Sequence, residues 1–226
     1  MSATEFTKRQ ARPGWPELAI ALVIYAVGVS MLGLWMLGIP DQQVIMRINV
    51  GGIANGAIGL VALLAAYGLR VRDWRAFGFR PTTAKWLWIS AGLGLLAFGL
   101  IFVVEAVYFH FITEPNTQGD FEAAAKGGLI SMLTLLFTSA VLGPIGEELV
   151  FRGVVASALD RYGAWIAVVG SAALFAIIHG PSVILVDAFV VGLMLGVVFR
   201  QSGSIWPAIV LHIVYNGLNL IYYSTL

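Results

Sequence analysis

The chain has 226 residues, of which 59% are hydrophobic and only 11% charged, and its mean hydropathy is +0.89. These values lie outside the range of soluble domains and indicate an integral membrane protein. The net charge of +1 argues against a nucleic-acid partner, which would require clustered basic residues. The sequence has no cysteine, which excludes disulfides, a thiolate nucleophile and cysteine-based metal sites.

Seven apolar runs of about the length that crosses a bilayer as a helix follow one another along the chain. All are expected to be helices, because an open strand edge would leave backbone groups unpaired in lipid. The predicted fold class is therefore all-α, a polytopic transmembrane helical bundle of about seven spans. The runs lie near residues 18–39, 48–69, 86–111, 129–157, 164–179, 183–199 and 205–223.

Basic residues predict the orientation. Residues 1–15 are expected to form a cytoplasmic N-terminal tail, and residues 16–226 a single transmembrane helical domain. The tail carries Lys8, Arg9 and Arg12, and the run after it has no clear small-residue cleavage site, which favours a retained anchor. With the N-terminus inside, only Arg47 and Lys126 of the 13 basic residues fall outside. We expect a multi-pass protein of the cell membrane with a cytoplasmic N-terminus and membrane lipid as its surroundings.

Two glycine pairs are spaced by one helical turn, Gly52 with Gly56 and Gly192 with Gly196. Such spacing permits close approach of two helices. Glycine as common membrane filler is an equally good explanation from the sequence.

Ionisable side chains are costly within membrane spans, so they point first to function. Glu147, Glu148 and Arg152 lie together in GPIGEELVFRG, residues 143–153. Glu148 and Arg152 share a helix face with the acid first, the favourable order for an ion pair. Glu147 points roughly 100° away and has no partner in this stretch, which suits a general base. An alternative is that the three charges only mark the cytoplasmic end of the span.

Two histidines follow in later runs. In FAIIHG, Phe175 lies one turn before His179, so that its ring can pack against the imidazole, and a helix stop follows at residues 180–181. In HIVYNG, His212 and Asn216 share a helix face. Each histidine alone has a structural explanation, as a helix-end residue or as half of an Asn–His hydrogen bond between helices.

Two further acidic residues lie inside apolar runs. Glu105 and Asp187 have no partner pattern comparable to that of the other candidates.

Depth gives a rough test of whether these residues meet. At 1.5 Å per residue from the cytoplasmic helix ends, Glu147 lies about 15 Å deep and His212 about 12 Å deep. His179 comes out about 24 Å deep if its helix starts at Gly163. Either that helix begins below the membrane surface, or it is tilted, or His179 lies outside the site.

Together the three segments resemble a known pattern. EELVFR (147–152) matches EExxxR, FAIIH (175–179) matches FxxxH and HIVYN (212–216) matches HxxxN. Their order and separation resemble the CPBP (CAAX prenyl protease and bacteriocin-processing, ABI) family of intramembrane proteases. The resemblance places the protease-like region at about residues 129–220.

The resemblance implies an intramembrane endopeptidase that cuts a peptide or a membrane protein, with substrates entering from the cytoplasmic side. Glu147 would activate water with His179, and His212 and Asn216 would stabilise the oxyanion. Glu148 and Arg152 would hold their helix in place.

Members of the family are often called metalloproteases. Glu147, His179 and His212 would be the ligands of a catalytic zinc, the one candidate cofactor. The chain has no HExxH helix that demands zinc, and a metal-free mechanism is favoured.

Two other functions compete with proteolysis. A non-catalytic scaffold or bacteriocin self-immunity protein would retain the fold, although it would be expected to have lost at least one motif residue. A proton-coupled transporter could use the same residues as a relay, although no inverted repeat is visible. The protease assignment requires Glu147, His179 and His212 to lie within about 10 Å of one another.

Overall fold

The computed structural model describes residues 12–226, so Lys8, Arg9 and most of the expected tail lie outside the described residues. It is 83% helical with no strand in the described part, which confirms the all-α polytopic bundle. The elements are α1 (Trp15–Leu37), η1 (Asp41–Gln43), α2 (Val44–Leu69), η2 (Trp74–Phe77), α3 (Ala84–Phe111), α4 (Gly119–Ala125), α5 (Leu129–Leu135), η3 (Leu136–Leu142), α6 (Gly143–Glu148), η4 (Leu149–Ala156), α7 (Ser157–Leu159), η5 (Asp160–Tyr162), α8 (Ala164–Ile177), α9 (Val183–Ser202) and α10 (Ile205–Tyr223).

Among the described residues, six helices are long and apolar enough to cross a membrane, and α8 is a shorter apolar helix. The expected seventh span at 164–179 is therefore not of full length. Its 14 residues measure about 21 Å, less than the roughly 30 Å of a hydrocarbon core. The helix stops there because Gly180 has φ +77°, a left-handed conformation, and a proline follows it. His179 consequently lies in a turn within the bundle.

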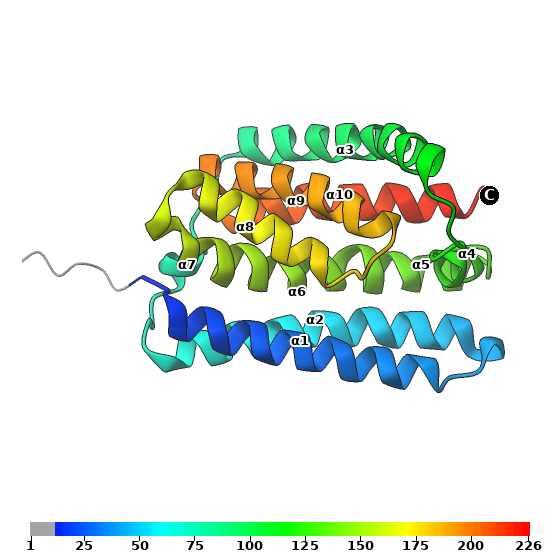
Figure 1. The fold of residues 1–226 in the computed structure, drawn as a ribbon, viewed down its shortest axis with the longest axis horizontal. Coiled ribbons are helices and arrows are strands. Elements are labelled where there is room, and N and C mark those ends of the chain that lie inside the picture. Colours follow the sequence, from blue (N-terminus) through cyan, green and yellow to red (C-terminus); the bar gives the residue numbers. More distant parts are fainter. Residues whose placement is uncertain (1–11) are drawn as a thin grey trace, which may run out of the picture.

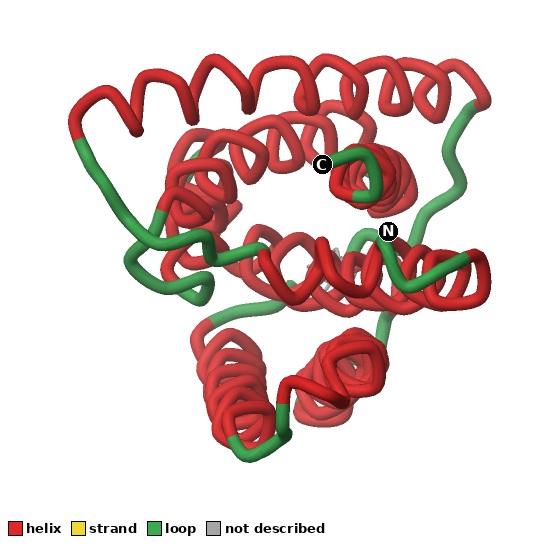
Figure 2. The backbone as a smooth tube through the Cα atoms, turned by 90° about the vertical axis from the view of Figure 1, so that its right-hand side faces the viewer, coloured by secondary structure: helices red, strands yellow, loops and turns green. Residues whose placement is uncertain are grey.

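The helices form layers (Figures 1 and 2). The antiparallel pair α1 and α2 lies on one side, and α3, α8, α9 and α10 lie on the other. The continuous helix Leu129–Tyr162 runs between them, in contact with α2 on one face and with α8 and α10 on the other. We call it the central helix. Two stretches of it, η3 and η4, are π-helical, and α6 with both glutamates lies between them.

Glycines bring α2 against the central helix. A Cβ atom added at Gly52 would lie 2.8 Å from the Thr138 carbonyl carbon, and one at Gly56 would lie 2.7 Å from the Leu142 carbonyl oxygen. At Gly59 it would collide with the Gly146 backbone. The expected close approach at Gly52 and Gly56 is confirmed, and side chains here would force the two helices apart.

The second glycine pair works in the same way between α9 and α8. Added Cβ atoms at Gly192 and Gly196 would lie 3.1 Å from Ala172 and 3.2 Å from Val168. The predicted close approach is confirmed here too.

An ion pair joins the start of α1 to the end of α2. Arg70 Nη2 lies 2.9 Å from Glu17 Oε2, and the Glu17 carboxylate also accepts a hydrogen bond from the Gly14 amide. The hydrogen bond to Glu17 raises the pKa of Arg70.

The helix ends correct the depth estimate from the sequence. The central helix continues to Tyr162, beyond the expected end at residue 157, so Glu147 lies about 22 Å from its end. This agrees with the value of about 24 Å for His179. The value for His212 is also too small, because α10 begins inside the protein. The buried Ile205 donates its amide hydrogen to the Gly78 carbonyl.

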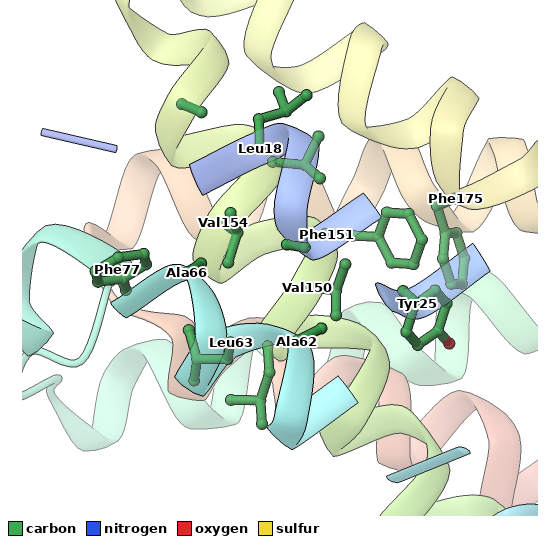
Figure 3. Close-up of a cluster of buried hydrophobic side chains, with 14 of the residues drawn as sticks. Leu18, Tyr25, Ala62, Leu63, Ala66, Phe77, Val150, Phe151, Val154 and Phe175 are labelled. Carbon is green, nitrogen blue, oxygen red and sulfur yellow. The ribbon is translucent and has the colours of Figure 1, made fainter. Parts of the chain in front are cut away.

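An aromatic row leads from the hydrophobic core to the motif residues (Figure 3). Tyr25, Phe151 and Phe175 lie side by side, with ring centroids 5.4 Å and 5.3 Å apart in edge-to-face geometry. Phe175 in turn contacts both motif histidines, at 4.8 Å from His179 and 5.6 Å from His212. The core and the candidate site are therefore one packed unit.

Candidate active site

A cavity of about 550 Å³ lies between the helices. Its wall includes Glu147, His179, His212 and Asn216, four of the six residues nominated from the sequence. Glu148 and Arg152 do not line it. The structure therefore separates the six into a group that faces the cavity and a pair behind it.

The pair behind the cavity is fully buried. Arg152 Nη1 lies 2.9 Å from Glu148 Oε1, which confirms the predicted ion pair along one helix face. Arg152 Nη2 also donates to the Gly192 carbonyl at 3.0 Å, and the guanidinium lies 4.9 Å from the centre of the Phe175 ring. Each charge offsets the desolvation of the other, and the arginine ties the central helix to α8 and α9.

His212 connects this pair to the cavity. Its Nδ1 lies 2.9 Å from Glu148 Oε1, and its Nε2 lies 3.6 Å from Glu147 Oε2. A carboxylate oxygen only accepts, so Nδ1 carries the hydrogen, and a second hydrogen on Nε2 is present only in the imidazolium form. Glu147, Glu148 and Arg152 together leave one negative charge.

Glu147 has a hydrogen-bond donor that its own helix does not supply. Asn55 Nδ2 on α2 donates to Glu147 Oε1 at 2.8 Å, and Tyr25 Oη on α1 donates to Asn55 Oδ1 at 2.7 Å. The expectation that Glu147 has no partner thus holds only within its own stretch. Neither Asn55 nor Tyr25 was nominated from the sequence. The available signal was a polar residue, Asn55, between the tightly packed glycines of α2.

His179 and Asn216 lie in the same cavity with separate contacts. His179 Nδ1 lies 2.8 Å from the Phe175 carbonyl oxygen, so Nδ1 donates and Nε2 remains an acceptor. Asn216 Nδ2 donates to the Ser139 carbonyl at 3.3 Å. The structure therefore brings Glu147 and His212 together and places His179 beside the same phenylalanine as His212.

The arrangement does not fit a metal ion. Within residues 12–226, no group of three or more His, Asp or Glu side chains is placed to hold one. Of the three nominated zinc ligands, His212 directs its ring nitrogens to two glutamates, and His179 donates through Nδ1 to a carbonyl.

Burial of the Glu148–Arg152 pair predicts a large stability difference between two Arg→Met variants. Arg152→Met leaves Glu148 buried without its cation and is expected to cost about 3–5 kcal/mol of unfolding free energy. Arg200→Met removes a half-exposed partner of Asp160 and is expected to cost at most about 1 kcal/mol. Unfolding in mixed micelles measures both. Equal losses would show that the buried pair has no special role.

One family model matches the chain. It is described as type II CAAX prenyl endopeptidase Rce1-like and covers residues 129–218, the segment that carries all six nominated residues. No curated protein and no solved structure matches the chain. Asn55 and Tyr25 lie outside the matched segment. Residues 129–218 are therefore similar to the Rce1-like members of the CPBP family, the family that the three motifs resemble.

Proposed function

We propose that this protein is an intramembrane endopeptidase in which Glu147 activates a water molecule that attacks a peptide bond. The Rce1-like match at residues 129–218 supports a CAAX-protease-type intramembrane endopeptidase. The observation that carries the mechanism is the contact of Glu147 Oε2 with His212 Nε2, 3.6 Å apart at the wall of a cavity. Glu148 and Arg152 neutralise each other nearby, so Glu147 remains available as the base.

The proposed reaction begins with water bound beside Glu147. Glu147 takes a proton from the water while the oxygen attacks the carbonyl carbon of the substrate. The negative charge then develops on the carbonyl oxygen, where donors stabilise it most. His212 serves as a donor through Nε2–H, and the Asn216 amide is the second donor. Glu147 finally gives the proton to the leaving amine as the C–N bond breaks, and the products are a carboxylic acid and an amine.

His212 and His179 are held differently, and this suggests different tasks. Glu148 fixes the ring of His212 through Nδ1, so the ion pair behind the cavity orients an imidazole inside it. Because Nδ1 of His179 donates to the Phe175 carbonyl, its Nε2 can accept a hydrogen bond and is suited to orient the water together with Glu147.

Localisation in the cell membrane with a cytoplasmic N-terminus is part of the proposal. The cavity lies toward the end of the bundle that is opposite to the start of α1. Its wall includes Met36 near the end of α1, Gln118 just before α4 and Tyr223 at the end of α10. Basic residues gather at the opposite end of the bundle, at positions 70, 72, 75, 80, 85, 161 and 200. Because basic residues favour the cytoplasmic side of a membrane, this basic end of the bundle is expected to face the cytoplasm. Substrate would then reach Glu147 from the opposite, non-cytoplasmic side. This differs from the cytoplasmic access that the family resemblance implies.

Cysteine labelling tests the orientation. The sequence has no cysteine, so Thr117→Cys, next to the cavity-wall residue Gln118, and Arg72→Cys at the basic end each introduce one thiol. In intact cells, a membrane-impermeant maleimide is expected to label position 117, and to label position 72 only after permeabilisation. The reverse pattern would place the cavity on the cytoplasmic side.

Removal of the base tests the reaction. Glu147→Gln preserves an acceptor for Asn55 but cannot take a proton, and is expected to lower the cleavage rate at least about 100-fold. Fluorogenic apolar peptides in detergent provide the assay. Glu122→Gln, on α4 and outside the cavity wall, is the matched control and should cleave like the natural protein. Undiminished cleavage by Glu147→Gln would refute the mechanism, and no cleavage by any form across a broad panel would favour a scaffold.

Asn55 provides a test from outside the family segment. Asn55→Leu removes the hydrogen bond to Glu147 and leaves Tyr25 unpaired, so kcat/KM is expected to fall about 10-fold or more. Asn49→Leu, on the same helix, breaks a hydrogen bond with Thr138 away from the cavity and controls for loss of a polar helix contact. Comparison of cleavage rates at matched folded fractions is the measurement. Equal losses in the two variants would deny Asn55 a role in positioning Glu147.

A further inference from the structure

The cavity contains a second pair of acidic residues. Glu105 on α3 and Asp187 on α9 both line it, and their carboxyl groups lie within hydrogen-bond reach of each other. Neither belongs to the three motifs, and Glu105 precedes the family segment. The mechanism proposed above uses neither residue.

Asp187 is a buried acidic residue whose carboxyl group lacks part of its hydrogen bonding among the described residues. The residue is only 3% exposed, and its Oδ1 has no hydrogen-bond partner among the described residues. A buried carboxylate without a donor or a cation is costly. The group therefore needs either a proton shared with Glu105 or a positively charged partner from outside.

The cavity supplies no such partner. Its described wall holds three acidic residues, Glu105, Glu147 and Asp187, and no lysine or arginine. Arg47, next to the wall residue Ile48, is bound to Asp120 at 2.6 Å and does not line the cavity. A divalent metal does not fit, because no third acidic or histidine ligand is placed with this pair. The chemistry that remains is a cationic organic group, an ammonium or a guanidinium.

Helix α10 gives the distance from this pair to the reacting bond. His212 contacts Glu147, and Tyr215, Asn219 and Tyr223 on the same helix line the cavity together with the two carboxyl groups. Both α3 and α9 pack against α10. The middle of that stretch, near Asn219, is two turns or about 10 Å from His212. An extended peptide covers this distance in about three residues.

We propose that Glu105 and Asp187 form a subsite for a lysine or arginine side chain of the substrate, about three residues from the bond that is cut. The subsite rests on the proposed protease function and defines its substrate class as peptides with a basic residue near the cleavage point. An entering cation replaces the shared proton, allows both carboxyl groups to ionise and supplies the missing donor to Asp187. The protein would thereby select against wholly apolar segments, which otherwise suit a cavity in the membrane.

A lysine scan tests this selectivity. A set of fluorogenic apolar peptides carries one lysine at each position up to five residues on either side of the cleaved bond. The matched set carries norleucine, which has a similar length without the charge. The natural protein is expected to prefer lysine at least tenfold in kcat/KM at one position about three residues from the bond. Glutamate at that position should be the poorest substrate.

Variants of the pair tie the preference to these residues. Asp187→Asn and Glu105→Gln are each expected to reduce the ratio of kcat/KM for the lysine and norleucine peptides to near one. Because the readout is a ratio, it does not depend on how much folded protein each variant yields. Asp120→Asn, which alters the acidic residue that binds Arg47 outside the cavity wall, should keep the ratio of the natural protein.

The outcomes separate the subsite from the protease function. Cleavage that requires Glu147 but shows no charge preference at any position would overturn the subsite alone and leave a proton-sharing structural pair. A lysine preference that survives in both variants would also overturn it. Where no peptide is cut, fluorescence anisotropy of the labelled lysine and norleucine peptides on Glu147→Gln protein measures binding directly, and equal affinities would refute the subsite.

Discussion

The buried ion pair of Glu148 and Arg152 is the interaction on which the rest of the site depends. Both side chains are fully buried, and the arginine also reaches the Gly192 carbonyl on α9. Glu148 Oε2 and Arg152 Nε have no partner among the described residues, so the cost of burial is only partly offset. Such a pair stabilises little in itself. It fixes where the central helix, α9 and α10 meet, because Glu148 Oε1 also holds His212.

The second constraint is the close contact of α2 with the central helix. A Cβ atom at Gly146 would lie 2.6 Å from the Gly56 Cα atom, so the two backbones touch one residue before Glu147. Only at this separation does the short side chain of Asn55 reach the carboxylate. Packing of the first two helices, which the family segment does not include, therefore completes the environment of the proposed base.

The sequence predicted what local periodicity and motif spacing determine. Apolar run lengths predicted the helices, and the four-residue spacing of Glu148 and Arg152 predicted their ion pair. Glycine spacing indicated both close helix contacts. The predictions that failed were those that depended on where the helices begin and end. The central helix continues to Tyr162 without a break in its backbone pattern, and α10 starts beneath the loop after η2.

Contacts between distant helices leave no local pattern in a single sequence. The hydrogen bond from Asn55 to Glu147 joins residues 92 positions apart, and the pairing of Glu105 with Asp187 joins α3 to α9. The candidate zinc ligands show the same limit, since their residue types suit zinc whereas their placement within residues 12–226 does not. Residue types and their spacing indicate which chemistry is available, but only the packing of the helices shows which side chains come into contact.

A double-mutant cycle on the ion pair tests whether Glu148 and Arg152 neutralise each other in the folded protein. Unfolding free energies of Glu148→Gln, Arg152→Met and the double variant give the coupling between the two side chains. We expect the double variant to lose at least about 1 kcal/mol less than the two single losses added together, because each single variant leaves a buried charge unpaired. Losses that add to within about 0.5 kcal/mol would contradict it, since the two residues would then not act as one neutralising pair.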